Sequence, residues 1–306
     1  MIQEKQCFPC PVPEPQAVSG IVRRSFIAYI ANFRFCSKLF AFPAAAVLVG
    51  SLPYTLFSDV AHANRDFLSI SLIWIWYLLA QIPLYYSCAV RATILQRMVL
   101  LPDEEFVTAA AFANRVWSKR CTGSVTRDII QSVGFVALIA LGCAGWYILG
   151  PYSPLFFVLA AVLSVFAFFG CFSSGFFFDC FSLSVACEEG SLSEHARRGF
   201  SLFRRSFWRG SSFQMLLFAP YLFLIVFLNP VTLYYLPQVA KIGLWQCISP
   251  SAAPIWLRLC GDLFTSAYTM ISFPIMYICV ANFVNDLRVR NDMPLLADEQ
   301  TRSICQ

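Results

Sequence analysis

Six long runs of apolar residues constrain this 306-residue chain more than any other feature of its sequence. A helix needs about 20 mostly apolar residues to cross the hydrocarbon core of a bilayer. Runs of this length predict transmembrane helices, because a spanning segment must pair its backbone polar groups internally. The predicted fold class is therefore all-α: a polytopic membrane protein with six transmembrane helices. The predicted spans cover residues about 39–57, 67–90, 129–149, 154–180, 211–235 and 261–284.

The overall composition agrees with this prediction. Hydrophobic residues make up 58% of the chain and charged residues 13%, whereas soluble domains average about 45–50% and about 25%. This balance argues against a soluble enzyme, a disordered chain and a nucleic-acid binder with a basic surface in water. No nucleic-acid partner is expected, and we interpret the net charge of +5 as a membrane-facing pattern.

The fourth apolar run is longer than a simple span. It begins at Pro154 and stays apolar to about Cys187. As a helix it would measure about 50 Å, against a hydrocarbon core of about 30 Å. We expect this helix to tilt or to extend past the membrane on the cytoplasmic side.

The basic residues are sorted between the two sides of the predicted bundle. Nineteen of the 22 Lys and Arg residues lie before the first span, between spans two and three or four and five, or after the sixth. Cytoplasmic loops of membrane proteins carry the excess of Lys and Arg. The pattern predicts a multi-pass protein of the cytoplasmic membrane with both termini in the cytoplasm. The three exceptions are Arg65, Lys241 and Arg258.

Two tails flank the predicted membrane domain, which covers residues 19–292. Residues 1–18 form a Pro-rich tail that we expect to be flexible, and residues 293–306 form a second cytoplasmic tail. The first tail contains the single Cys-x-x-Cys motif, Cys7 and Cys10. A zinc site of this kind requires a second ligand pair. We therefore interpret these cysteines as unpaired thiols and expect no metal.

Three segments before the odd-numbered spans share one amphipathic pattern. Apolar residues recur at i, i+4, i+7 and i+11, a spacing that forms a narrow stripe on a helix. The first and third segments are offset by 174 residues, and this offset carries Arg23–Arg24 onto Arg197–Arg198. The stripes are Val22, Phe26, Tyr29 and Phe33; Phe106, Ala110, Ala113 and Trp117; and Ala196, Phe200, Phe203 and Phe207.

Each stripe predicts an amphipathic elbow helix at the cytoplasmic interface, followed by a two-span hairpin. The chain then consists of three helix-plus-hairpin units. One interpretation is that the arginines bind anionic lipid headgroups or that the elbows bind a membrane-protein partner. The simpler interpretation, which we favour, is that the elbows anchor the bundle and the arginines are solvated. The candidate headgroup contacts are Arg23, Arg24, Arg197, Arg198, Arg204 and Arg205.

Two motifs resemble those of a known family. One is Ala186-Cys187-Glu188-Glu189-Gly190 with a later Phe207-Trp208-Arg209, and the other is Asn285-Asp286-Leu287-Arg288-Val289-Arg290-Asn291-Asp292. They are similar to motifs of a bacterial six-span integral membrane family related to the membrane domain of glycerophosphodiester phosphodiesterases and to YciC-like proteins. The resemblance implies a six-span bundle in a bacterial inner membrane, and it implies no specific activity.

The charges of the second motif can be interpreted from helical geometry alone. Asp286 and Arg290 lie at i and i+4 of a helix that continues past the sixth span, a spacing suited to an ion pair. Glu188 and Glu189, after the fourth span, are the acidic residues expected to pair with Arg288 and Arg290. These five residues form a candidate structural clamp between the ends of spans four and six.

No pattern in the sequence indicates catalysis. The chain lacks the G-x-S-x-G, G-x-x-x-x-G-K-[ST] and G-x-G-x-x-G motifs of hydrolases and nucleotide-binding proteins. Its two histidines, His62 and His195, form no metal-binding pattern, and we expect both to be solvated. The chain is therefore expected to be non-enzymatic and to need no cofactor.

Two functions remain open. The preferred one is a non-enzymatic integral membrane protein that acts as a scaffold or in envelope maintenance. The alternative is a transporter of small molecules or lipids, which requires ionisable groups inside the bundle. Asp179 is the candidate residue for transport, although its place near the cytoplasmic end of the fourth span also fits a structural role. The transport hypothesis predicts a polar cavity that reaches Asp179.

Overall fold

The computed structural model of the protein describes Phe8 and residues 14–63, 67–143, 154–231, 233–234, 254–291 and 293. All regular structure in these residues is helical, in agreement with the predicted all-α class. The Cys7–Cys10 motif, the side chain of His62, and residues 292 and 294–306 lie outside the described part. The helices are α1 (Val18–Ala31), α2 (Phe33–Ala63), α3 (Phe67–Leu100), α4 (Phe106–Cys143), α5 (Pro154–Cys187), α6 (Leu192–Arg205), α7 (Phe207–Phe227) and α9 (Ile255–Arg290).

Three of the described helices are long and apolar enough to cross a membrane: Phe33–Phe57 in α2, Leu68–Leu100 in α3 and Ile255–Arg290 in α9. Much of the apolar surface of α3 faces away from the rest of the chain, with Leu78 62% and Ile82 65% exposed. Lipid is the solvent that such a surface favours. The helices therefore agree with the membrane protein that the composition predicts.

Several long helices extend beyond the predicted spans, whereas α7 ends at Phe227, short of the predicted end of the fifth span at residue 235. α3 continues to Leu100, and α4 begins at Phe106 and runs without a break to Cys143. The loop expected between spans two and three is thus only the turn at residues 101–105, where Pro102 disfavours a helical conformation of the residue before it. The amphipathic segment predicted in this loop is the first part of α4, because residues 106–128 contain no proline to break the helix.

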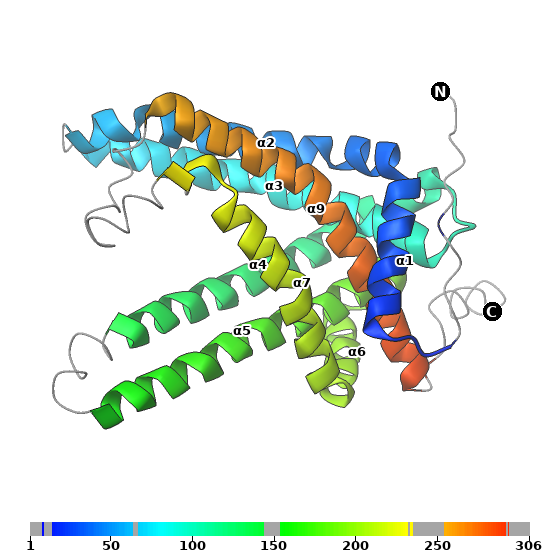
Figure 1. Ribbon diagram of the computed structural model, residues 1–306. Coiled ribbons are helices and arrows are strands. Elements are labelled where there is room, and N and C mark those ends of the chain that lie inside the picture. The colour runs from blue at the N-terminus through cyan, green and yellow to red at the C-terminus, as the bar shows by residue number, and fades with distance from the viewer. Residues whose placement is uncertain are drawn as a thin grey trace.

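Two of the amphipathic segments are separate short helices. α1 and α6 are each joined to the next long helix by one residue, Asn32 or Ser206 (Figure 1). The Asn32 N–H bonds the carbonyl of Ala28, and the Ser206 N–H bonds that of Leu202, so each junction keeps its helical hydrogen bonds. α6 begins with a capping box, in which Ser191 and the glutamate three residues later exchange hydrogen bonds.

The helices pack in a cyclic order. α2 and α3 run side by side with α9, and α4 and α5 form a second pair (Figure 1). α6 packs on α5, α4 packs on α3, and α1 packs on α9. Each amphipathic segment therefore contacts the second long helix of the preceding hairpin, and α1 closes the cycle against the last helix.

A small residue lies where each amphipathic segment crosses its neighbour. Ser25 of α1, Ala109 of α4 and Gly199 of α6 are buried and occupy equivalent positions of the repeated pattern. A Cβ atom added at Gly199 would lie 3.0 Å from the backbone nitrogen of Phe181 in α5. The absence of a side chain at this position is what lets α6 approach α5 so closely.

Candidate functional site

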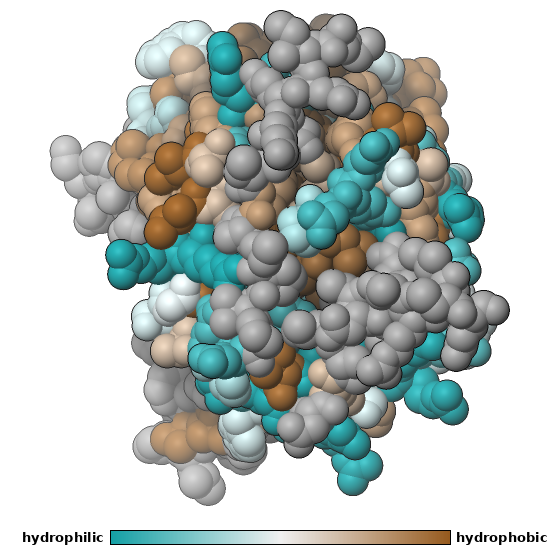
Figure 2. Space-filling view, turned by 90° about the vertical axis from the view of Figure 1, so that its right-hand side faces the viewer, coloured by the Kyte–Doolittle hydropathy of each residue, from teal (hydrophilic) through white to brown (hydrophobic). Residues whose placement is uncertain are grey.

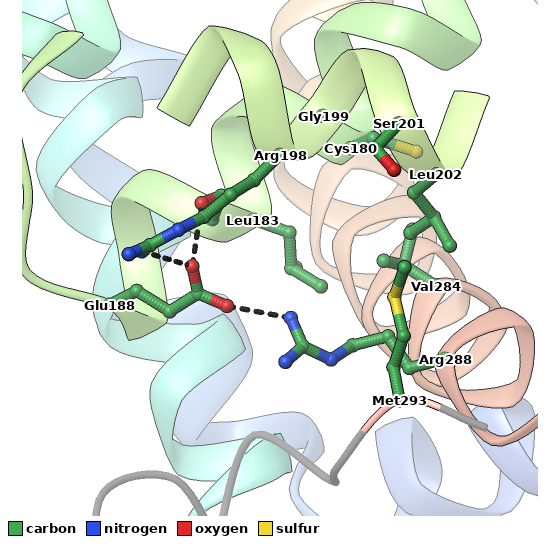
Figure 3. A pocket seen from close by; sticks show the side chains of 11 residues that line it. Cys180, Leu183, Glu188, Arg198, Gly199, Ser201, Leu202, Val284, Arg288 and Met293 are labelled. Carbon is green, nitrogen blue, oxygen red and sulfur yellow. Dashed lines mark hydrogen bonds and ion pairs between the residues drawn. The ribbon is translucent and has the colours of Figure 1, made fainter. Parts of the chain in front are cut away.

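Charged side chains gather where α5, α6 and α9 lie close together (Figure 3). Glu188, directly after α5, accepts hydrogen bonds from Nη1 of Arg288 at 2.6 Å and Nη1 of Arg198 at 2.7 Å. Ser184 donates to the same carboxylate at 2.9 Å. The side chains of Glu188 and Arg288 are 8% and 11% exposed. These residues, together with His195, are called the Glu188 cluster below.

His195 of α6 corrects one prediction. A solvated ring was expected, but His195 is 1% exposed and its Nδ1 atom lies 3.0 Å from Oγ of Ser184. Because the ionised carboxylate of Glu188 only accepts hydrogen bonds, the Ser184 hydroxyl hydrogen points to it, and His195 then donates to Ser184 from Nδ1. The ring is buried since it shares the face of α6 that carries Gly199 and Leu202.

The surroundings of Glu188 and His195 lower the pKa of both groups. Burial raises the pKa of Glu188, but the Arg288 cation and the hydrogen bonds from Ser184 and the two arginines outweigh burial and lower it. Burial lowers the pKa of His195, and the positive charge of Lys119 lowers it further. The cluster therefore holds an ionised Glu188 beside a neutral His195 at neutral pH.

A pocket of about 360 Å³ opens beside the Glu188 cluster (Figure 3). Leu183, Leu202 and Val284 are among the apolar residues that line it, and Arg198 and Arg288 line it as well. Glu188 engages both arginines and thereby joins the end of α5 to α6 and α9. Within the part of the chain that the structure describes, no group of His, Cys, Asp and Glu side chains could hold a metal ion.

A second ion-pair group surrounds Asp286, near the end of α9. Its carboxylate accepts hydrogen bonds from Nε of Arg290 at 2.9 Å, from Nη2 of Arg209 at 3.0 Å and from the backbone N–H of Gln16 at 2.6 Å. Both arginines also donate to the Gln16 carbonyl. Gln16 belongs to the predicted tail, so this group ties the segment before α1 to α7 and α9.

The structure divides the five predicted clamp residues between several contacts. Asp286 pairs with Arg290, and Arg288 pairs with Glu188, but these pairs belong to different groups. Glu189 instead forms an exposed ion pair with an arginine of α4 at 3.2 Å. Partners that sequence reasoning missed are Ser184, His195, Arg209 and Gln16.

Arg97 follows the predicted end of the second span, so the sequence predicts a loop residue, but the structure shows a buried cation on α3. Its side chain is 1% exposed and makes two hydrogen bonds to Glu104, at 2.6 and 2.8 Å. It also donates to the carbonyl of Ala186 at the end of α5, and its guanidinium lies 3.9 Å from the ring centroid of Phe112. Arg97 thereby joins α3, α4 and α5 through one side chain.

Asp179 of α5 lines a cavity of about 230 Å³ whose wall is mostly apolar, with a few polar side chains. Gln214 of α7 donates a hydrogen bond to its carboxylate, and Nη1 of Arg127 lies 3.8 Å from it. Asp128 and Tyr85 line the same cavity and are joined by a hydrogen bond of 2.7 Å. The cavity therefore brings together two carboxylates, one guanidinium and two phenols, Tyr85 and Tyr277, from α3, α4, α5 and α9.

The candidate headgroup arginines lie on α1 and α6. Hydrophilic and hydrophobic residues are interspersed on the face of the molecule that Figure 2 shows. Phe26 of α1 and Phe200 of α6 are 51% and 55% exposed beside the arginines. Arg198 differs because it also contacts Glu188. The exposed arginines are Arg23, Arg197, Arg198, Arg204 and Arg205, and Arg24 is half-buried.

Comparisons of this chain with models of protein families, with curated proteins and with solved structures found no match. The resemblance to the six-span bacterial family therefore remains a prediction that rests on the two motifs.

Proposed function

We propose that the chain is a six-span protein of a cytoplasmic membrane, in which α2, α3, α4, α5, α7 and α9 cross the bilayer. Both termini lie in the cytoplasm, and α1 and α6 lie along the inner interface. The exposed arginines beside Phe26 and Phe200 support this orientation, since such faces suit an anionic membrane surface.

Reporter fusions test this orientation. Green fluorescent protein fused after Gln306 is expected to fluoresce, and alkaline phosphatase at the same position is expected to be inactive. An active phosphatase there would place the C-terminus outside and reject the proposed topology. In intact cells, a membrane-impermeant maleimide is expected to label the exposed Cys260 near the start of α9.

We infer a non-enzymatic scaffold role within the membrane for this bundle. The observation that carries it is the pair of exposed faces on α1 and α6, where an aromatic ring stands beside basic side chains. Interfaces between proteins favour aromatic and arginine residues. The ion-pair groups around Glu188 and Asp286 hold these faces in fixed positions on the bundle.

The scaffold role predicts a defined partner in mild detergent. We expect Phe200→Ala to remove a partner that co-purifies with the wild-type chain, because Phe200 contributes most of the exposed ring surface of α6. Leu78→Ala is the matched control, since Leu78 is equally exposed but lies on the apolar surface of α3. Repeated recovery of the lone wild-type chain would contradict the scaffold role.

Transport is the second candidate, and the cavity at Asp179 favours it. Two carboxylates and one guanidinium give this cavity a net negative charge, which suits a small cationic solute. In proteoliposomes, Asp179→Asn is expected to abolish the flux of small organic cations, whereas Asp103→Asn, an exposed control in the turn before α4, leaves it unchanged. Absence of flux through the wild-type protein would reject this candidate.

A further inference from the structure

An apolar groove runs between α1, α7 and α9. Its volume is about 730 Å³, more than three times that of the cavity at Asp179. Phe26, Leu216, Leu224 and Ile275 are among the side chains that line it. Leu216 is 56% exposed and Leu224 36% exposed, so the groove opens to the outside of the bundle.

The length of the groove matches one leaflet of a bilayer. On α7 its lining extends from Phe213 to Leu224, and on α9 from Tyr268 to Cys279. Each stretch rises by about 16 Å along its helix. Half of a hydrocarbon core of about 30 Å is about 15 Å. One acyl chain of a phospholipid therefore has the length and the chemistry to fill the groove.

One end of the groove carries a positive charge. Ser19 and Arg23 of α1 line the groove. The nearby Ser25 of α1 accepts a hydrogen bond from Asn282 of α9, which places this part of α1 at the Cys279 end of the groove and away from Tyr268. Arg23 is exposed, so its guanidinium can meet a ligand from the membrane surface. A phosphate group next to an acyl chain is the anion that this arrangement of charge and apolar surface fits.

We propose that the groove binds a single anionic phospholipid, with an acyl chain between α7 and α9 and its phosphate at Arg23. This inference rests on the proposed placement of α1 at the inner interface, which assigns the lipid to the cytoplasmic leaflet. The bound lipid fills the space between α1 and α7 and couples the first elbow helix to the last hairpin.

The internal repeat supplies a matched control for Arg23. Arg197 lies 174 positions later, at the equivalent place on α6, and it is also exposed. It does not line the groove. General attraction to anionic lipid affects both arginines equally, whereas a defined site in the groove depends on Arg23 alone.

The experiment is native mass spectrometry of the full chain in detergent, titrated with dioleoylphosphatidylglycerol or dioleoylphosphatidylcholine. The wild-type protein is expected to retain one phosphatidylglycerol in preference to phosphatidylcholine. Arg23→Gln is expected to weaken retention of phosphatidylglycerol about fivefold, the value typical of one arginine at a charged membrane surface. Arg197→Gln leaves retention unchanged.

A second pair of variants tests the apolar part of the site. Leu216→Trp places a large ring in the groove and is expected to reduce retention of both lipids, whereas Leu78→Trp, at an exposed position of α3, does not. Equal losses for Arg23→Gln and Arg197→Gln, or no loss for Arg23→Gln, would overturn the proposal. Loss of a homodimer, and not of lipid, in Leu216→Trp would also overturn the proposal, because the groove would then be a contact between two copies of the chain.

Failure of this proposal and failure of the proposed topology can be told apart. Retention of lipid is measured in detergent and does not depend on orientation, whereas the reporter fusions depend only on orientation. Suppose that phosphatase fused at the C-terminus is active while lipid retention still depends on Arg23. The lipid site would then be supported, and its assignment to the cytoplasmic leaflet would be rejected.

Discussion

At the scale of single residues, the burial of charge explains why the ends of α5 and α9 stay together. An ion removed from water loses several kcal/mol of solvation, and only close partners restore it. Glu188 has three such partners in Ser184, Arg198 and Arg288. Breaking the buried Glu188–Arg288 pair is therefore expected to cost more than breaking an ordinary surface ion pair, which contributes about 0–1 kcal/mol.

Removal of one partner from the buried pair is expected to destabilise the protein strongly. Arg288→Ala leaves Glu188 without its closest cation and should lower the free energy of unfolding by about 3–5 kcal/mol. Unfolding by sodium dodecyl sulfate, followed by circular dichroism, measures the loss. Glu189→Ala, which breaks an exposed pair, is the control and should cost less than about 1 kcal/mol. Similar losses in both variants would contradict the burial argument.

The buried position of His195 leads us to expect that the stability of the protein depends on pH. Its pKa in the folded state is lowered below the ordinary value of 6.5. As the pH falls through 6.5, the unfolded chain therefore binds a proton that the folded chain does not, and stability decreases. Glu188, Lys119 and Arg198 are the charged groups that act on this ring.

The measurement is the melting temperature in detergent between pH 7.5 and pH 5. The wild-type melting temperature should fall over this range, and His195→Asn should remove most of the fall, because Asn carries no titrating group. The stability that Glu188 contributes disappears only at lower pH, below its unfolded value of 4.5. A slope that persists in His195→Asn would assign the effect to another residue.

Substitution of Asp286 is expected to lower stability and to loosen the segment before α1. Asp286→Ala removes the acceptor shared by Gln16, Arg209 and Arg290, so the melting temperature in detergent should fall. Limited proteolysis should cut the segment before α1 sooner than in the wild-type chain. An unchanged melting profile would count against a role of this group in holding the bundle.

At the scale of elements, the amphipathic segments show how far a periodic pattern determines a helix. The spacing of Val22, Phe26, Tyr29 and Phe33 indicates a helix, but the structure divides this stripe. Tyr29 is buried, whereas Val22, Phe26 and Phe33 are exposed. The face that α1 buries is displaced by one position and includes Ser25. This face also buries Ile21, Ala28 and Tyr29, and its small residues Ser25 and Ala28 allow close approach of a neighbouring helix.

Gly199 tests this explanation. Gly199→Leu places atoms against the backbone of Phe181 and should lower stability by about 1–3 kcal/mol. Gly20→Leu is the matched control on α1, because an added Cβ meets nothing within 4 Å there. Chemical denaturation in detergent measures the free energy of unfolding of both variants. Equal stability of the two variants would mean that α6 does not depend on close contact with α5.

At the scale of the whole molecule, α1 packs on α9, the last described helix, as α4 packs on α3 and α6 packs on α5. Asn282 of α9 donates a hydrogen bond to Ser25 of α1 at 3.0 Å, which joins positions 257 residues apart. The bundle is therefore closed by its N-terminal helix.

A disulfide across this contact tests the closure. With native cysteines replaced by serine or alanine, Ser25→Cys with Asn282→Cys should cross-link in membranes under mild oxidation. Ile27→Cys with Asn282→Cys should not, because Ile27 is 56% exposed and faces away from α9. The readout is the mobility of fragments on gels after proteolysis between the two sites. Equal cross-linking of both pairs would reject the cyclic order.

Much of the architecture could be predicted from local sequence. The apolar runs indicate membrane helices, the helical stripe recurs after 174 residues, and Asp286 with Arg290 at i and i+4 forms the expected pair. These features depend on neighbours within a few turns of one helix. Helical periodicity and hydropathy are therefore enough to predict them.

The contacts around Glu188, Asp286 and His195 could not be predicted from local sequence, because they join residues far apart in the chain. Arg209 meets Asp286 across 77 positions, Arg288 meets Glu188 across 100, and the Gln16 backbone meets Asp286 across 270. His195 is buried because α6 turns that face toward α5. The sequence by itself determined that the fold is helical and where its apolar runs lie. Only the packed bundle decided which charges lose water and which partners replace it, because that choice depends on which helices lie side by side.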